Sequence, residues 1–294
     1  MTISLFKKRP DPFDYEILRR CKCCGNGFQG RFCNRCGEKV IESHERSLLN
    51  FLDSVLNAFT FLDGKFIKSL KMLVTRPGEL SRNIGDGVRV PYMKMVSLFF
   101  LANFFYFFFP LWDSFNSSLY TQMNSLRHSA QATRMVNERL AKENISMNVF
   151  TEKYEVQSTN LSKLLLVLLA IMFALALMVI NYSRKVYFFD HVLFSLEFYS
   201  FHILLNLLII SYIFLLLIKG GNALGVDCRL LLSDNFFSRL IMVTLGYFLF
   251  RGQIHFYNQK WYWGAVRSIA LLFFFVQSIY IYRTILFYIT MWTI

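Results

Sequence analysis

Two short cysteine motifs near the N-terminus constrain this chain more than any other feature. Cys21–Gly25 and Cys33–Gly37 each read C-x-x-C-G, and together they give the spacing C-x2-C-x8-C-x2-C. Two residues between paired cysteines let both sulfurs reach one ion from a single tight turn, and four thiolates suit tetrahedral zinc. The glycine that follows each pair can adopt a positive φ at little cost and turn backbone N–H groups toward the sulfurs. The spacing predicts a zinc ribbon with four ligands: Cys21, Cys24, Cys33 and Cys36.

The same motifs leave alternatives open. Cys23 stands beside Cys24 and competes with it for the ion, although the symmetry of the two motifs favours Cys24. A redox-active dithiol pair and an iron–sulfur cluster also use closely spaced cysteines. Four protein ligands close the coordination shell of zinc, so we expect one structural ion and no catalytic metal. A module this small is expected to depend on that ion for its folding.

The rest of the chain has the composition of a membrane protein. Of its 294 residues 55% are hydrophobic and 17% are charged, whereas soluble domains average about 45–50% apolar and roughly 25% charged residues. Apolar segments near the length that a bilayer requires lie at 95–112, 164–180, within 187–218, at 236–256 and at 269–293. We predict an all-α polytopic membrane protein with about five transmembrane helices, four or six being acceptable, a small N-terminal zinc ribbon and amphipathic interfacial helices.

Residues 45–75 separate the cysteines from the first apolar segment and show helical periodicity, interrupted at Asp63-Gly64. Lysines accompany the apolar stripe of the second half, at positions 65, 68 and 71. This pattern is typical of a helix in an anionic membrane surface, and equally of a helix packed on the protein's own membrane domain. Arg76-Pro77-Gly78 is expected to end the helix. The predicted domains are therefore 1–43, the ribbon; 44–94, interfacial helices and a loop; and 95–294, the transmembrane domain.

The distribution of basic residues predicts the orientation. With five spans, the N-terminal region, Arg184-Lys185 and the linker after the fourth span fall on one side, which the positive-inside rule places in the cytoplasm. The loop at about 114–161 is nearly balanced in charge and is expected outside, with helical structure around 123–142. Met1–Phe13 has no apolar core of a cleavable signal peptide. We therefore expect a cytoplasmic N-terminus.

The third apolar segment contains an unusual number of polar residues, which define a possible intramembrane polar site: Asp190, His191, Glu197 and His202. Ionisable groups inside a span are costly and usually functional. They are compatible with a proton or ion path, with a second metal site, or with hydrogen bonds between helices. The chain contains no nucleophile elbow, phosphate-binding glycine loop or zincin motif, so no catalytic residue is assigned.

The order of motifs resembles a family of uncharacterised bacterial membrane proteins with an N-terminal zinc ribbon. The resemblance rests on the paired C-x-x-C-G motifs and on three later patterns: Leu70-x-x-Leu73-x-x-Arg76-Pro77-Gly78, Gly87-x-Arg89-Val90 and Asp190-His191-x-x-Phe194. It implies zinc, several spans and a bacterial inner membrane, but no reaction. Glu197 and Tyr199 stand where members of that family often have histidine, which weakens a histidine-based metal site in the third span.

These features favour a membrane scaffold or accessory subunit whose cytoplasmic ribbon docks a protein partner while its spans pack within a membrane complex. A small ion-coupled transporter, or a membrane-embedded enzyme using Asp190, His191, Glu197 and His202, is the alternative. The expected partners are the lipid bilayer and a protein, and a homo-oligomer stays open. Nucleic acid is not expected, because the arginines near the cysteines are explained by charge compensation of a four-thiolate metal centre.

Overall fold

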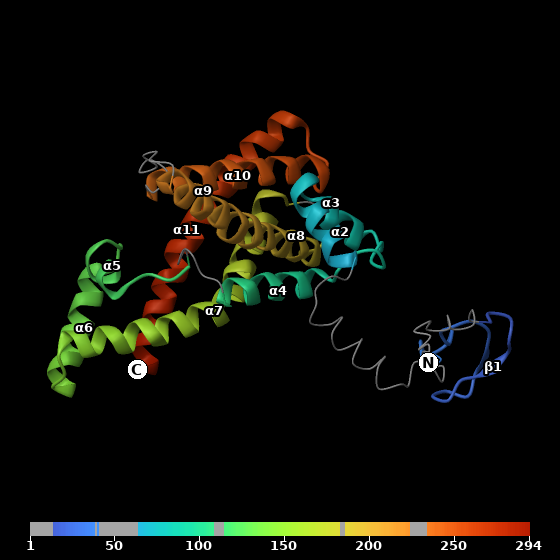
Figure 1. Ribbon diagram of the computed structural model, residues 1–294, viewed down its shortest axis with the longest axis horizontal. Helices are drawn as coiled ribbons and strands as arrows, with labels where there is room; N and C mark the ends of the chain where they lie inside the picture. Colours follow the sequence, from blue (N-terminus) through green and yellow to red (C-terminus); the bar gives the residue numbers. More distant parts are fainter. Residues whose placement is uncertain (1–13, 39, 41–63, 109–114, 183–185, 224–233) are drawn as a thin grey trace, which may run out of the picture. The chain divides into compact units, whose positions relative to one another are not determined.

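The structure is a computed structural model that describes residues 14–38, 40, 64–108, 115–182, 186–223 and 234–294 (Figure 1). The first half of the expected interfacial helix, residues 45–63, lies outside the described residues, as does Cys228. The chain divides into two compact units, Met1–Asp63 and Gly64–Ile294. Each unit is described by itself.

The first unit contains a small cysteine module, residues 14–38. Its secondary structure is a two-stranded antiparallel hairpin, β1 (Arg19–Arg20) and β2 (Gly27–Phe28), in which Arg19 pairs with Phe28. Phe28 is buried and forms a small apolar cluster with Cys21 and Cys33. So little apolar surface cannot offset the entropy of ordering the chain, which makes the module dependent on a further crosslink.

The second unit is helical throughout its described part. It begins with α2 (Gly64–Thr75) and α3 (Glu79–Gly85), which are separated at Arg76-Pro77-Gly78 as the sequence predicts. The apolar helix α4 (Met95–Phe108) follows. The remaining elements are α5 (Leu119–Asn124), α6 (Ser129–Glu143), α7 (Met147–Ile180), α8 (Phe188–Phe201), η2 (His202–Ile210), α9 (Ser211–Ala223), α10 (Asp234–His255) and α11 (Trp261–Thr293).

Helix α8 forms the centre of this unit. It packs against α7 and α4 along its length and against α2 and α3, and Figure 1 shows α4 running beside it. From Leu193 to Phe201 all of its side chains are buried, polar ones included. A helix buried all round must satisfy its polar side chains through neighbouring helices, and this requirement governs the site described below.

The helix does not keep α-helical geometry throughout. At His202 it continues as a π-helix, η2, for nine residues before α-helical geometry resumes in α9. Wide helical turns of this kind are rare and frequently occur at functional sites. The segment His202–Ile210 is apolar apart from its first residue and Asn206, so its sequence periodicity did not predict the change.

Helices α7 and α11 pack as an antiparallel pair. The Tyr282 hydroxyl donates to the backbone oxygen of Ser162 (2.6 Å), and Arg267 Nη1 donates to Asn181 Oδ1 (3.1 Å) at the other end. Beyond Ser162 and Tyr282 both helices continue into a lobe with α5 and α6. This lobe has its own apolar cluster, which includes Val136, Phe150 and Phe287. The structure thus places helices α5 and α6 within the predicted 114–161 loop.

Among the described residues, three helices are long and apolar enough to cross a membrane: Met147–Ile180, Phe188–Gly221 and Trp261–Thr293. The five spans of the sequence prediction are therefore not shown. The first predicted span is the shorter apolar helix α4, and its predicted last residues, 109–112, lie outside the described residues. The fourth corresponds to α10, in which Arg239, Arg251 and Gln253 lower the hydropathy.

Candidate functional site

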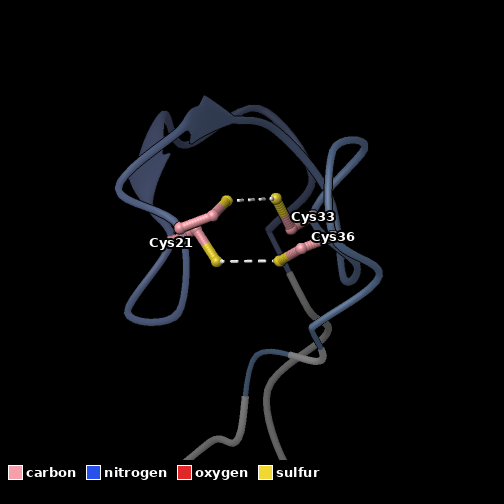
Figure 2. Close-up of side chains that lie close together, drawn as sticks. Cys21, Cys33 and Cys36 are labelled. Atoms are coloured by element: carbon pink, nitrogen blue, oxygen red, sulfur yellow. Dashed lines mark hydrogen bonds between the residues drawn. The ribbon is translucent and has the colours of Figure 1, made fainter.

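The four predicted metal ligands converge in the first unit. The Sγ atoms of Cys21, Cys24, Cys33 and Cys36 all lie within 4.8 Å of one another. Cys21 and Cys36 are 3.5 Å apart and Cys24 and Cys33 are 3.7 Å apart, measured between sulfurs. Figure 2 shows Cys33 and Cys36 directed from one turn toward the turn that carries Cys21. These distances are close to the separation of roughly 3.8 Å that a tetrahedron with metal–sulfur bonds of about 2.3 Å requires.

The two turns that carry the cysteines are built alike. In the first, Gly25 N donates to Cys21 O (3.0 Å) and Cys21 N donates to Asn26 O (2.8 Å). In the second, Gly37 N donates to Cys33 O and Cys33 N donates to Glu38 O, both at 2.9 Å. Both glycines have positive φ, 72° and 77°, which confirms the conformation predicted from the C-x-x-C-G pattern. The repeat aligns two equivalent pairs of sulfurs.

The position of Cys23 distinguishes it from the four. Its side chain is exposed, and it is not one of the sulfurs that lie within 4.8 Å of one another. A hydrogen bond from the Cys36 backbone N–H lowers the pKa of the Cys33 thiol to about 6. A similar hydrogen bond from the Glu38 backbone N–H lowers the pKa of the Cys36 thiol. Contact with the Cys21 sulfur and burial outweigh it, so the pKa of Cys36 is raised. Four close cysteines in this arrangement can hold a metal ion.

The polar residues of the third apolar segment do not converge in this way. Glu197 is fully buried, and its carboxylate accepts two backbone hydrogen bonds, from Gly78 N (2.8 Å) and Ser81 N (2.9 Å). These are free N–H groups at the N-terminus of α3, where a carboxylate is favoured by hydrogen bonding and by the helix dipole. Glu197 therefore joins α8 to the start of α3.

The backbone around this junction is closely packed. Gly78 has a φ of 86°, and a Cβ added to it would lie 2.9 Å from the Cα of Gly252 in α10. A Cβ on Gly252 would in turn overlap the ring of Phe194, which stacks on Phe256 at a centroid distance of 5.3 Å. Arg82 Nη1 also donates to His255 O (3.1 Å). Two glycines thus allow α3, α8 and α10 to meet around the Glu197 carboxylate.

Asp190 and His191 form separate contacts at the start of α8. Asp190 Oδ2 accepts from the backbone N–H of Tyr187 (2.9 Å), which closes the first turn of the helix. His191 Nδ1 lies 2.8 Å from the Tyr257 hydroxyl, and the two rings stack. Burial, followed by the charge of Asp190, raises the pKa of Tyr257 well above its usual range, so Tyr257 stays a neutral hydrogen-bonding group.

His202 lies at the start of η2, beyond the reach of the other three. Its Nδ1 is 3.3 Å from Asn206 Nδ2, and Asn206 Oδ1 accepts from the Thr244 hydroxyl (2.8 Å). The ring also makes edge contacts with Phe115 and Phe275. In the described part of the chain, the four cysteines are the one group of three or more His, Cys, Asp or Glu side chains close enough to share an ion.

The sequence indicated these polar residues but not their partners. Glu197 and Gly78 are separated by 119 positions. Nearly every residue has a backbone N–H, so the sequence does not indicate which of them Glu197 binds. A weak signal existed in Arg76-Pro77-Gly78, since a helix that restarts directly after such a break exposes new N–H groups. Gly252, which packs at the junction, and Tyr257, which contacts His191, carried no signal that set them apart from other residues of their segment.

Comparison with known protein families gives a match in the region of α2 to α4. Residues 63–107, which include α2, α3 and all but the last residue of α4, match a family described as "Protein of unknown function (DUF3667)". No curated protein and no solved structure matches the chain. The matched region includes Gly78 and Ser81, whose N–H groups bind Glu197, so the junction and the family match share the same part of the fold.

Proposed function

We propose that this chain is a membrane-anchored docking protein of the bacterial inner membrane, in which a cytoplasmic zinc ribbon binds a protein partner and the helical unit acts as anchor. The observation that carries the proposal is a contrast. Sulfur ligands converge on one point in residues 21–36, whereas Asp190, His191, Glu197 and His202 each bind a different partner within the helical unit. Convergence is what a reaction centre requires, and dispersed polar contacts are typical of helix packing.

Zinc is the proposed ion because its chemistry matches the ligand set. Four cysteines in two C-x-x-C turns are the donor set of structural zinc sites, and the short sulfur–sulfur distances fit one tetrahedral ion. A site closed by four protein ligands has no open position for substrate. The ion would therefore supply folding free energy to the ribbon and present its surface to a partner.

The membrane anchor is proposed from length and composition. At about 1.5 Å per residue, the 34 residues of α7 extend roughly 50 Å, more than the ~30 Å of a bilayer core. The excess length is the polar first half of α7, which packs in the lobe of α5 and α6. The excess of Lys and Arg in the segments assigned to the inner side supports a cytoplasmic position of the ribbon.

The decisive experiment is a comparative purification of the full chain in mild detergent, with mass spectrometry of what accompanies it. Wild type and Cys23→Ser should retain a stoichiometric protein partner, and Cys33→Ser should lose it, because the ribbon loses its ion. Glu197→Gln and His202→Ala should retain the partner. A monodisperse chain without a partner, or a partner held equally by Cys33→Ser, would contradict the docking function. Loss of a measured cellular function in Glu197→Gln at normal protein level would favour the transporter or enzyme instead.

A further inference from the structure

A cluster of charged side chains lies where α3 meets the last turns of α10 (Figure 1). Arg82 of α3 donates through Nη1 to the backbone oxygen of His255 (3.1 Å). Glu79, on the same helix, lies 3.6 Å from His255 Nδ1 and accepts from Arg76 Nη1 (3.3 Å). Arg251 precedes His255 by one turn of α10, so the two side chains share a face of that helix. Three arginines from two helices are thus grouped around His255 and Glu79.

Arg251 is the member of this cluster whose contacts are incomplete. Its Nε atom is buried and has no hydrogen-bond partner, and the same is true of His255 Nε2. The segments that form the cluster, 64–108 and 234–294, are described without gaps and contain three acidic residues: Glu79, Asp86 and Asp234. The first two already pair with other arginines of the cluster, and the third begins α10, roughly 25 Å along the helix from Arg251. Within the part of the chain that the structure describes, Arg251 forms no ion pair.

The charges of the three arginines act together at one place. All three influence the ring of His255 electrostatically. Glu79 opposes them there, at 3.6 Å from the ring. Asp86 is 70% exposed and 3.8 Å from Arg82 Nε, so water screens that pair. Positive charge therefore exceeds negative charge around the two nitrogens that have no partner.

A phosphate group matches this arrangement better than other common anions. Guanidinium groups stay charged and bind phosphate oxygens through parallel N–H bonds. A phosphate has enough oxygens to accept from α3 and α10 at once, and it would give Arg251 Nε the acceptor that it lacks. Capping of a helix end explains Arg82, whose Nη1 binds the carbonyl of the last residue of α10. It does not explain the buried Nε of Arg251.

We propose that the three arginines bind a phosphate group at the junction of α3 and α10, with Arg251 as the main ligand and His255 as the residue that positions Arg82. The inference goes beyond the docking function proposed above and depends neither on the ribbon nor on its partner. The phosphate belongs either to a soluble compound or to a lipid headgroup. Trp261 and Trp263, which are 71% and 53% exposed at the start of α11, are residues typical of a membrane interface, so the test includes a lipid.

The test uses the full chain, purified in detergent and freed of lipid and phosphate by exchange at constant ionic strength. Thermal unfolding is followed in titrations with inorganic phosphate, dioctanoyl phosphatidic acid and dioctanoylglycerol. At least one of the two phosphate probes should bind saturably and raise the unfolding midpoint, and dioctanoylglycerol should not. Tighter binding of the phosphatidic acid would assign the site to a lipid headgroup, and equal or tighter binding of inorganic phosphate would assign it to a soluble compound. No saturable response to either probe would overturn the proposal.

Variants locate the binding. Arg251→Gln should weaken the apparent affinity by about tenfold or more, because charged hydrogen bonds are lost, and Arg251→Lys should restore part of it. Arg76→Gln changes a side chain that is 64% exposed and should weaken binding even where Arg251→Gln fails to fold. Arg239→Gln, which removes an exposed arginine of the same helix roughly 18 Å from Arg251, should leave the affinity within about twofold of wild type. Equal losses in Arg239→Gln and Arg251→Gln would overturn the site.

The phosphate site and the docking function can fail separately. Cys33→Ser should lose the protein partner but bind the phosphate probe with the affinity of wild type, whereas Arg251→Gln should lose the probe but retain the partner and the zinc. Loss of phosphate binding in Cys33→Ser at normal stability of the helical unit would contradict a site built from α3 and α10 alone.

Discussion

The cysteine module and the helical unit handle buried polar atoms in opposite ways. In the module, four sulfurs from two equivalent turns lie within 4.8 Å of one another. In the helical unit, buried polar side chains are more numerous, and Glu197, His191 and His202 contact different neighbours. The four sulfurs of the module are arranged so that they can hold an ion, whereas the helices pack on one another.

This difference has a physical origin in size. A module of about 25 residues buries too little apolar surface to fold without help, so a metal ion can supply the missing free energy. The helical unit has a continuous apolar core around α8, and its polar groups need only avoid being left unsatisfied.

The largest effect is expected from a substitution that removes one of the four converging sulfurs. Cys33→Ser should reduce bound zinc from one equivalent to near zero and make residues 14–38 sensitive to limited proteolysis, because the remaining three thiolates bind the ion far more weakly. Metal analysis of the purified full chain and protease mapping measure both. Cys23→Ser is the matched control and should keep one equivalent of zinc. Equal zinc loss in both variants would contradict the ligand assignment, and a protease-resistant metal-free module would contradict the structural role.

A smaller effect is expected where the helices meet. Gly252→Ala places a methyl group into the Phe194 ring and should lower the free energy of unfolding by roughly 1–3 kcal/mol, the usual cost of overpacking. Gly246→Ala, on the same helix, places its methyl group 3.5 Å from Leu272 Cδ1, an ordinary contact, and should change stability little. Denaturation in detergent compares the two. Similar stabilities would mean that Gly252 does not limit the approach of α8 and α10.

The sequence predicted the metal site better than it predicted the helical unit, and the reason is locality. Cys21 and Cys24, or Cys33 and Cys36, are brought together by one turn whose glycine has a positive φ, so spacing alone predicts the geometry. The partners of Glu197 lie at the start of α3 and the partner of His191 lies in the turn after α10, both distant in sequence. Their contacts depend on how α3, α8 and α10 pack, which a pattern of apolar residues does not specify.

The structure shows three of the five predicted spans as long apolar helices, and the reason is related. Hydropathy separates apolar from polar segments, but it does not separate a membrane span from a buried core helix. Arg239 and Arg251 make α10 less apolar than α7 or α11, although α10 packs against α11. The π-helix η2 could not be predicted from the sequence either. Segment 202–210 is almost uniformly apolar, so a change from 3.6 to more residues per turn does not alter its pattern of apolar and polar residues.

The most subtle prediction concerns the charge at the Glu197 junction. Glu197→Gln keeps the shape of the side chain, but its neutral amide accepts weaker hydrogen bonds from Gly78 and Ser81 and loses the attraction to the N-terminus of α3. The free energy of unfolding should fall by about 1–2 kcal/mol, with bound zinc unchanged. Glu79→Gln, which alters a partly exposed carboxylate of the same helix, is the matched control and should cost less. If Glu197→Gln left stability unchanged, the carboxylate would not be holding α3 on α8, and the contrast between converging cysteines and dispersed polar contacts in the helical unit would lose its central example.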